Sequence, residues 1–260
     1  MVEQTPTLPD GCAWITYVRC HDDIGWGVLA SEAAGTREHA GFDLAYVSRF
    51  FAGETPGAYA RGRGFQGDGA HAHGSNGMSS ALAGIEAALE CGDASALVLA
   101  ERRLLMLHGI AFVAAGVPLL YMGDEIALGN DPAFNGDDSE GRWLQRPAMD
   151  WAQVDAVDDE SSHVAARINA SMRRMISIRR AIPALAADAP MRALALDNPA
   201  LFGLARGEDF MALFNLGGTP QMLDAWREDD ARQWRDLHSG ETVGVPVLLP
   251  PYGFCWLQAD

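Results

Sequence analysis

Two short apolar runs, each followed by a long polar loop and then by a helix, constrain the fold of this chain more than any other feature. Residues 13–18 read AWITYV, and residues 116–125 read GVPLLYMGDE. Both runs are rich in β-branched, aromatic or aliphatic residues, which predicts two buried strands. The order strand, loop, helix, strand, loop, helix is typical of a parallel α/β unit, in which the loops after the strands carry the chemistry.

Apolar spacing and turn residues predict what lies between and after these strands. One helix is expected over residues 95–115, and residues 24–80 are expected to form a loop region with a short helical pattern at 44–51. The glycine-rich run 62–77, GRGFQGDGAHAHGSNG, is predicted to be loop only. A later helix has apolar residues three and four positions apart, which places them on one buried face: Val164, Ile168, Met172, Met175, Ile178 and Ile182.

The pattern of apolar and turn residues changes after residue 183. Short runs of alternating apolar residues follow, separated by turn residues: ALFGLARG, DFMALFNL, QWRDLHSGETV and VPVLLPPYGFCWLQ. This pattern predicts a small antiparallel β domain. We therefore expect an α/β domain over residues 1–186, with a loop subdomain over about 24–80, and an all-β domain over residues 187–260. Two strand–helix units are too few to close an eight-stranded barrel, so strands are missing from any barrel to which they belong.

The charge balance argues against some partners. The chain of 260 residues has 35 Asp and Glu against 19 basic residues, all of them arginine, for a formal net charge of −16. Nucleic acid is not expected as a partner, because phosphate binding needs a positive surface. The acidic surplus fits neutral or cationic small molecules, and equally a solvated surface of no functional meaning.

Neither a membrane span nor secretion is expected. The apolar stretch 104–122 is nearly long enough to span a bilayer, but Gly109, Gly116 and Pro118 divide it into a buried helix and a buried strand. The N-terminal residues lack the basic and apolar regions of a signal peptide. The four cysteines are widely separated, so the reducing cytoplasm is the default setting.

A histidine and two aspartates, His21, Asp22 and Asp23, directly follow the first predicted strand. Because successive residues of a strand point to opposite faces, the two aspartates cannot form the opposed carboxylate pair of a glycosidase, whose groups lie about 5 Å or more apart. His71 and His73 could add metal ligands, but no spacing of a known metal motif is present. We expect no metal and no organic cofactor. A strand-end histidine with two solvated aspartates is the non-functional alternative.

Four motifs resemble, in this order, the second half of enzymes of the α-amylase superfamily (glycoside hydrolase family 13): YVRCHDDIGW, GVPLLYMGDE, DDSEGRW and PYGFCWL. The likeness is greatest to the amylosucrase branch, which acts on sucrose, because HDDIGW is followed by a long inserted loop. The resemblance covers nearly the whole chain. It implies that the two strands are the seventh and eighth of a (β/α)8 TIM barrel and that a small antiparallel β-sandwich follows them.

The resemblance implies roles for five residues. His21 is similar to the histidine that hydrogen-bonds the glucosyl ring, and Asp22 to the third catalytic carboxylate, which stabilises the oxocarbenium-like transition state. Asp23 and Gln66 match contacts on the acceptor side, where fructose leaves and the acceptor sugar arrives. Arg142 resembles an arginine that closes the sugar pocket by pairing with acidic groups, a task that suits its fixed donor fork. An ordinary loop salt bridge is the alternative for Arg142.

The chain departs from the family pattern at several places. Glu140 and Gly141 are inserted before Arg142, where the family has DDSRW. His71 and His73 stand where the family has a loop arginine. The nucleophile aspartate in a GxRxD setting, the acid/base glutamate, and the Asp and Asn-His motif after the third strand have no match. Retaining chemistry needs both of those carboxylates, so this chain supplies only a supporting group.

The resemblance thus implies an intact enzyme that cleaves sucrose with retention and transfers glucose to an α-glucan or to water. This chain alone is expected to be inactive, and the missing N-terminal half of the barrel is the expected protein partner. Two alternatives stay open. One is a sucrose hydrolase, and the other is a non-catalytic remnant or a carbohydrate-binding partner subunit.

Overall fold

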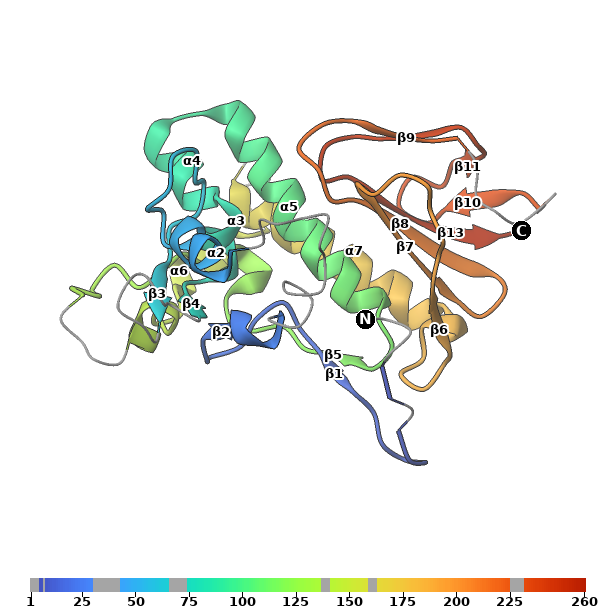
Figure 1. Cartoon of the computed structure of the whole chain (residues 1–260), viewed down its shortest axis with the longest axis horizontal. Coiled ribbons are helices and arrows are strands. Elements are labelled where there is room, and N and C mark those ends of the chain that lie inside the picture. The colour runs from blue at the N-terminus through green and yellow to red at the C-terminus, as the bar shows by residue number, and fades with distance from the viewer. Residues whose placement is uncertain are drawn as a thin grey trace. The chain divides into compact units, whose positions relative to one another are not determined.

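A computed structural model describes residues 5–6, 8–29, 43–65, 74–136, 141–158, 163–224 and 232–260 (Figure 1). The chain forms two compact units, each built from segments that are distant in the sequence. The first, here called the sheet unit, comprises Met1–Val18, Leu105–Leu119 and Ala170–Asp260. The second, the loop unit, comprises Arg19–Leu104 and Leu120–Asn169.

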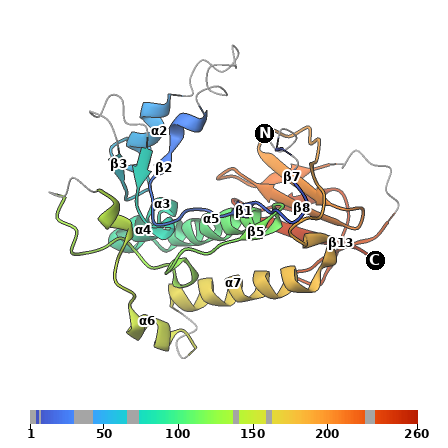
Figure 2. The ribbon, with the colours of Figure 1, turned by 90° about the horizontal axis from the view of Figure 1, so that it is seen from below.

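The two predicted strands pair in parallel in the sheet unit. β1 (Ile15–Thr16) lies beside β5 (Val117–Pro118) (Figure 2). Ile15 is opposite Val117, and Thr16 is opposite Pro118. The Val117 N–H donates to the Trp14 carbonyl at 2.8 Å, and the Leu119 N–H donates to the Thr16 carbonyl at 2.9 Å. The parallel pairing is therefore confirmed, although each strand has only two residues and is shorter than predicted.

Two long helices confirm the predicted helical segments. α5 (Ala94–Val113) and α7 (Val164–Ala181) each begin in the loop unit and end in the sheet unit. In the sheet unit, a Cβ on Gly109 of α5 would lie 3.4 Å from ring atoms of Phe214 and Phe254. The glycine therefore lets the helix backbone approach these rings. Of the apolar face predicted for the later helix, five residues are buried and Ile178 is half-buried: Val164, Ile168, Met172, Met175 and Ile182.

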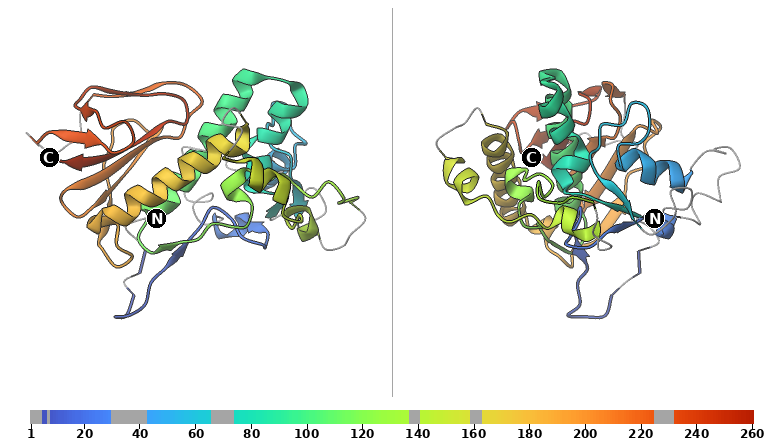
Figure 3. Two further views of the ribbon diagram at one scale, coloured as in Figure 1. Left: turned by 180° about the vertical axis from the view of Figure 1, so that it is seen from behind. Right: turned by 90° about the vertical axis from the view of Figure 1, so that its left-hand side faces the viewer.

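The predicted antiparallel β structure is present after residue 187. The strands lie in the orange and red part of the ribbon in Figure 3. Six of them form one sheet in the order β11-β10-β13-β8-β7-β6, and β12 pairs with β9 in a second sheet. All these pairs are antiparallel. The strands are β6 (Met191–Ala193), β7 (Leu201–Arg206), β8 (Phe210–Asn215), β9 (Gln221–Leu223), β10 (Trp234–Asp236), β11 (Thr242–Val243), β12 (Val247–Leu249) and β13 (Phe254–Ala259).

The two antiparallel sheets share one apolar core. Alternate residues of the central strands, among them Leu213 of β8 and Leu257 of β13, have no exposed surface (0%) and pack with Leu223 of β9 and Leu249 of β12. All six residues of β8 are buried, so the alternation of buried and exposed residues expected from the sequence is absent from this central strand. The domain boundary near residue 187 stays a prediction, since the compact units are interleaved along the chain.

One buried arginine of the sheet holds the end of α5. Arg206, the last residue of β7, has no exposed surface (0%). Its guanidinium donates to the carbonyls of Val113 (2.5 Å), Ala186 (2.6 Å), Ala189 (3.0 Å) and Pro190 (3.1 Å). The last carbonyls of a helix lack intrahelical partners and carry the negative end of its dipole, so a cation stabilises them.

The loop unit contains more regular structure than the sequence predicts. The expected short helix is present as α2 (Leu44–Phe51), with Asp43 as its N-cap. β3 (Arg63–Phe65) and β2 (Ile24–Gly25) both pair antiparallel with β4 (Gly74–Asn76). The prediction that residues 62–77 are loop only is therefore wrong for the residues in β3 and β4.

Glycine in this run serves close strand approach rather than loop formation. A Cβ on Gly62 would lie 2.4 Å from the Asn76 carbonyl oxygen, and a Cβ on Gly74 would lie 2.9 Å from the Ile24 carbonyl oxygen. Real side chains do not fit at such distances, so only glycine allows these backbones to meet.

Short helices complete the described structure. α3 and α4 were not predicted, and Gly84, with φ of +99°, separates them. None of the helices in the described ranges combines the length and apolar character needed to cross a membrane. The short helices are η2 (Trp26–Leu29), α3 (Ser79–Ala83), α4 (Ile85–Cys91), η3 (Asp124–Ile126), η4 (Gly141–Gln145), α6 (Trp151–Ala156) and η5 (Pro183–Leu185).

Candidate functional site

Arg19 fixes the backbone that carries the predicted site residues. Its side chain is buried and donates to the carbonyls of Cys20 (2.9 and 2.8 Å) and Asp22 (2.6 Å), and also to the Gly77 carbonyl. The guanidinium carbon lies 5.8 Å from the ring centroid of Tyr121. One cation therefore joins the turn after β1 to the residue that follows β4.

Both aspartates of the predicted cluster contact a single guanidinium. Arg142, in η4, forms an ion pair with Asp22 through Nε, and its Nε and Nη2 donate to Oδ1 of Asp23 at 3.2 and 3.0 Å. The inference that the two carboxylates point to opposite faces of a strand is wrong. The strand ends at Thr16, and residues 21 and 22 form a bend, which lets both carboxylates reach the same partner.

The two carboxylates differ in exposure and charge environment. The Asp22 side chain is 49% exposed, whereas that of Asp23 is 18% exposed. Partial burial raises the pKa of the Asp22 carboxyl, but the Arg142 cation and the backbone N–H of Asp23 outweigh it, so the pKa lies below its ordinary value. Asp22 is therefore a carboxylate at neutral pH and is accessible to a ligand.

The bend is tied to η4 through the backbone of His21. Arg146 Nε donates to the His21 carbonyl at 3.0 Å, and Gln145 Nε2 donates to it at 3.4 Å. Gln145 is fully buried, and its Oε1 accepts a hydrogen bond from the Gly77 N–H at 3.1 Å. These bonds hold the bend beside the helix that carries Arg142, while the His21 side chain is exposed.

Aromatic side chains support the same arrangement. The Arg142 guanidinium carbon lies 4.9 Å from the ring centroid of Phe65 in β3, which is within the range of a cation–π contact. Trp26 Nε1 donates to Ser75 Oγ at 2.8 Å, and its ring stacks on Phe51 at 5.1 Å between centroids. The three-stranded sheet, supported by α2, thus places the Phe65 ring beside the Arg142 guanidinium.

Asp124, in the motif GVPLLYMGDE, is a second carboxyl of interest in the loop unit. It is 1% exposed, and Ser79 Oγ donates to its Oδ2 at 3.1 Å. Burial raises the pKa of Asp124 to about 7, although Ser79 and Arg19 act in the opposite direction. Asp124 is therefore partly protonated near neutral pH, and its burial keeps it from direct contact with a sugar.

The structure brings together four of the five predicted site residues: His21, Asp22, Asp23 and Arg142. The insertion before Arg142 does not prevent it from reaching the aspartates. Gln66 lies outside the described residues. The catalytic and binding roles of all five stay predictions, because the geometry alone does not test them.

Sequence reasoning missed two residues that organise the cluster, Arg19 and Gln145. Arg19 stands inside the motif YVRCHDDIGW, but no spacing marks it as buried. Gln145 is one amide in a long polar loop, and nothing in its neighbourhood distinguishes it from a solvated residue. Only the hydrogen bonds that both side chains form with the backbone of the distant Gly77 reveal what they do.

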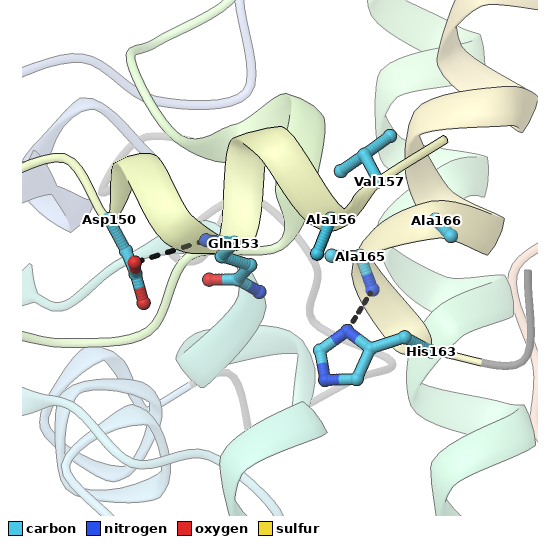
Figure 4. Close-up of a pocket in the computed structure, with 7 residues that line it drawn as sticks. All are labelled: Asp150, Gln153, Ala156, Val157, His163, Ala165 and Ala166. Atoms are coloured by element: carbon cyan, nitrogen blue, oxygen red, sulfur yellow. Dashed lines mark hydrogen bonds between the residues drawn. The ribbon is translucent and has the colours of Figure 1, made fainter. Parts of the chain in front are cut away.

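A separate hollow of about 370 Å³ lies in the loop unit, where α6 faces the start of α7 (Figure 4). Two of its polar side chains are helix caps: Asp150 accepts from the Gln153 N–H at 3.1 Å, and His163 Nδ1 accepts from the Ala165 N–H at 3.3 Å. None of its lining residues belongs to the cluster around Asp22. Within the described residues, no three His, Cys, Asp or Glu side chains are placed to hold a metal ion.

Comparison with known proteins gives a fold likeness. No family model matches the chain. A solved structure of maltooligosyl trehalose synthase matches with a TM-score of 0.50 and 15% identity, over 68% of this chain and 24% of that chain. The protein Ttha1563 from Thermus thermophilus matches with a TM-score of 0.46 and 22% identity, over 64% of this chain and 32% of that chain. AmyP in complex with maltose matches with a TM-score of 0.48 and 15% identity, over 61% and 34% of the two chains.

The match to maltooligosyl trehalose synthase shows a shared mixed α/β fold over part of the chain. The chain spans about a quarter to a third of the length of the three solved structures named above.

Proposed function

We propose that this chain is the sugar-holding part of an amylosucrase-like α-glucosyltransferase of the α-amylase superfamily. The whole enzyme would cleave sucrose with retention and pass glucose to a glucan or to water. The observation that carries the proposal is the joint contact of Asp22 and Asp23 with Arg142, directly after His21. The order of the family motifs, the parallel β1–β5 pair and the fold likeness to maltooligosyl trehalose synthase support it.

The electrostatics of the cluster suit this chemistry. Asp22 is ionised and half-exposed, so its negative charge is available to the positive charge that develops on a glucosyl ring as the bond to fructose breaks. An interaction that strengthens in the transition state accelerates the reaction, whereas one of constant strength does not. Asp23 is better shielded and held by two donors, which fits a positioning contact at the neighbouring sugar.

The proposed reaction needs two further carboxylates. One must attack the anomeric carbon to form a glycosyl-enzyme, and the other must protonate the oxygen that leaves with fructose and later activate the acceptor. The sequence contains neither in its family setting, so these groups come from outside this chain. The isolated chain is therefore expected to release no fructose from sucrose above background.

Because the sequence has neither of these two carboxylates in its family setting, a second candidate is a non-catalytic chain that binds α-glucosides. Both candidates require that glucosyl rings bind at Asp22, and they differ only in turnover. A sucrose hydrolase differs from the transferase in its acceptor, which is water.

Sugar binding is the direct test, and it uses the full chain. Saturation-transfer NMR with sucrose should show stronger transfer to glucosyl than to fructosyl protons. Asp22→Ala should abolish that transfer. Glu90→Gln is the matched control, because Glu90 pairs with Arg61 at 2.8 Å on the surface of the same unit, away from the cluster. Transfer that is absent in the natural chain, or unaffected by Asp22→Ala, would contradict the proposal.

A further inference from the structure

A buried carboxyl and a buried cation of the loop unit bind the same short segment of the chain. Arg19 and Asp124 are each 1% exposed. Arg19 donates to the carbonyl of Gly77. Ser79, two residues further along, donates from its Oγ to Oδ2 of Asp124 at 3.1 Å. The two ionisable groups are therefore held near each other and away from water.

The hydrogen bonds of Arg19 in the bend do not neutralise its charge. They go to the carbonyls of Cys20 and Asp22, which are neutral groups. Burial lowers the pKa of the Arg19 guanidinium, and the charge of Asp124 opposes this change more than that of any other group. Because a buried charge is costly unless it is paired, the carboxylate of Asp124 is the main counter-charge to the cation that holds the bend.

We propose that Asp124 is a positioning residue for the sugar site: its ionised form strengthens the hold of Arg19 on the bend, and its protonated form weakens that hold. The inference rests on the proposed function, because it concerns the affinity of the same site for a glucosyl ring. Arg19 donates to the carbonyl of Asp22 itself at 2.6 Å, so a shift of Arg19 moves the residue proposed to face the sugar. Asp124 acts only through Arg19.

The effect of pH has a definite direction. Burial raises the pKa of Asp124 to about 7. Above this pH the carboxylate attracts Arg19, and below it the neutral carboxyl leaves the buried cation with less compensation. The affinity for a glucosyl ring should therefore rise between pH 5.5 and pH 8. Global unfolding responds in the opposite sense, because it exposes the carboxylate to water, whereas release of Arg19 alone leaves the carboxylate buried without its cation.

Other groups around the pair also bear on its titration. Burial raises the pKa of Asp124, Ser79 and Arg19 lower it, and the charge of Glu125 raises it. Burial raises the pKa of the Tyr121 phenol, so this group stays neutral up to pH 8. The remaining titratable groups near Arg19 and in the bend are Cys20, Asp23 and the exposed His21.

NMR of the full chain, labelled with nitrogen-15 and carbon-13, tests the coupling in the absence of sugar. The amide signals of Asp22 and Asp23 should move between pH 5.5 and pH 8 with the midpoint of the Asp124 carboxyl carbon, and not only with that of the His21 imidazole. Asp124→Asn should remove this movement. Glu90→Gln is the control and should leave it unchanged, because Glu90 is a 59% exposed carboxylate of the same unit.

Ser79→Ala gives a readout that a purely structural role would not change. Ser79 donates to the carboxylate and so lowers the pKa of Asp124. Without this donor, the midpoint should move to higher pH at the Asp124 carbon and at the Asp22 amide together. This shift also decides the matter if Asp124→Asn fails to fold. Amides that do not move, that move equally in Asp124→Asn, or that keep their midpoint in Ser79→Ala would overturn the inference.

Sucrose titrations extend the test to binding. In the natural chain, the dissociation constant for sucrose should be about fivefold lower at pH 8 than at pH 5.5, a common size for coupling between two sites. In Asp124→Asn the two values should agree within about twofold.

The coupling and the proposed function fail separately. Amide signals that follow Asp124 in a chain that binds no sucrose at either pH keep the coupling and remove the proposed function. Sucrose that binds at Asp22 with equal strength at both pH values keeps the proposed function and removes the inference.

Discussion

Replacement of Asp124 by asparagine should remove a pH dependence from the stability of this protein. The carboxyl is 1% exposed, and its pKa in the fold is about 7, against an ordinary 3.8. The gap is roughly three pH units, and each is about 1.4 kcal/mol, so the full effect is about 4 kcal/mol. Between the two pKa values the folded state binds more protons than the unfolded state, so stability falls as the pH rises from about 4 to about 7.

Urea unfolding, followed by tryptophan fluorescence at pH 4, 5.5, 7 and 8, measures the effect. Other carboxyls titrate in both proteins, so the readout is the free energy of unfolding of Asp124→Asn minus that of the natural chain. This difference should increase by about 4 kcal/mol from pH 4 to pH 8. Asp209→Asn is the control, because the Asp209 side chain is 74% exposed and its removal should leave the pH profile unchanged.

A constant difference across this range would refute the reasoning. It would mean that Asp124 is ionised in the folded state down to its ordinary pKa, because Ser79 and Arg19 offset the effect of burial on that pKa. A difference that decreases with pH would mean that Ser79 and Arg19 outweigh burial.

Three further outcomes are expected. Arg206→Met should lower the free energy of unfolding by about 3–5 kcal/mol, because it removes a buried cation from four carbonyls. Arg235→Met is the control, because Arg235 forms an exposed pair with a carboxylate. In the same urea assay it should change the free energy of unfolding by less than about 0.5 kcal/mol. In the complete enzyme, Asp22→Asn should cut sucrose turnover by orders of magnitude with an unchanged far-UV circular dichroism spectrum; near-normal turnover would exclude a catalytic role. Asp23→Ala or Gln66→Ala should change the ratio of released glucose to glucan more than the rate of sucrose consumption, and an unchanged ratio with a collapsed rate would reverse that assignment.

The fold was predictable where periodicity and burial coincide. The apolar spacing of α7 is a direct consequence of one buried face. None of the residues of β7, β8 and β13 is exposed, so short apolar runs between turn residues, and not alternation of burial, made these strands predictable. The strands β3 and β4 were not predictable in this way, because their glycines are also typical of loops. Only the position of Gly62 and Gly74 against neighbouring carbonyl oxygens shows that these residues allow close strand pairing.

The candidate site was predictable in membership but not in geometry. His21, Asp22 and Asp23 stand together in the sequence, and the family resemblance added Arg142. The contact between Arg142 and both aspartates depends on a bend after β1, which Arg19 and Gln145 hold through backbone carbonyls. Gln145 and His21 are far apart in the chain, and no periodic signal marks the Arg19 side chain as buried, so local patterns did not reveal these hydrogen bonds.

The interleaving of the two compact units determines how the protein can be cut. The chain passes from one unit to the other four times, after Val18, Leu104, Leu119 and Asn169. A single proteolytic nick therefore cannot release either unit as one intact piece. A fragment that begins at residue 187 would keep the antiparallel strands but only two of the four carbonyls that Arg206 binds, those of Ala189 and Pro190. A fragment cut where the residue pattern changes would thus leave the buried Arg206 cation with too few acceptors. In a nicked full chain, the two pieces should remain associated.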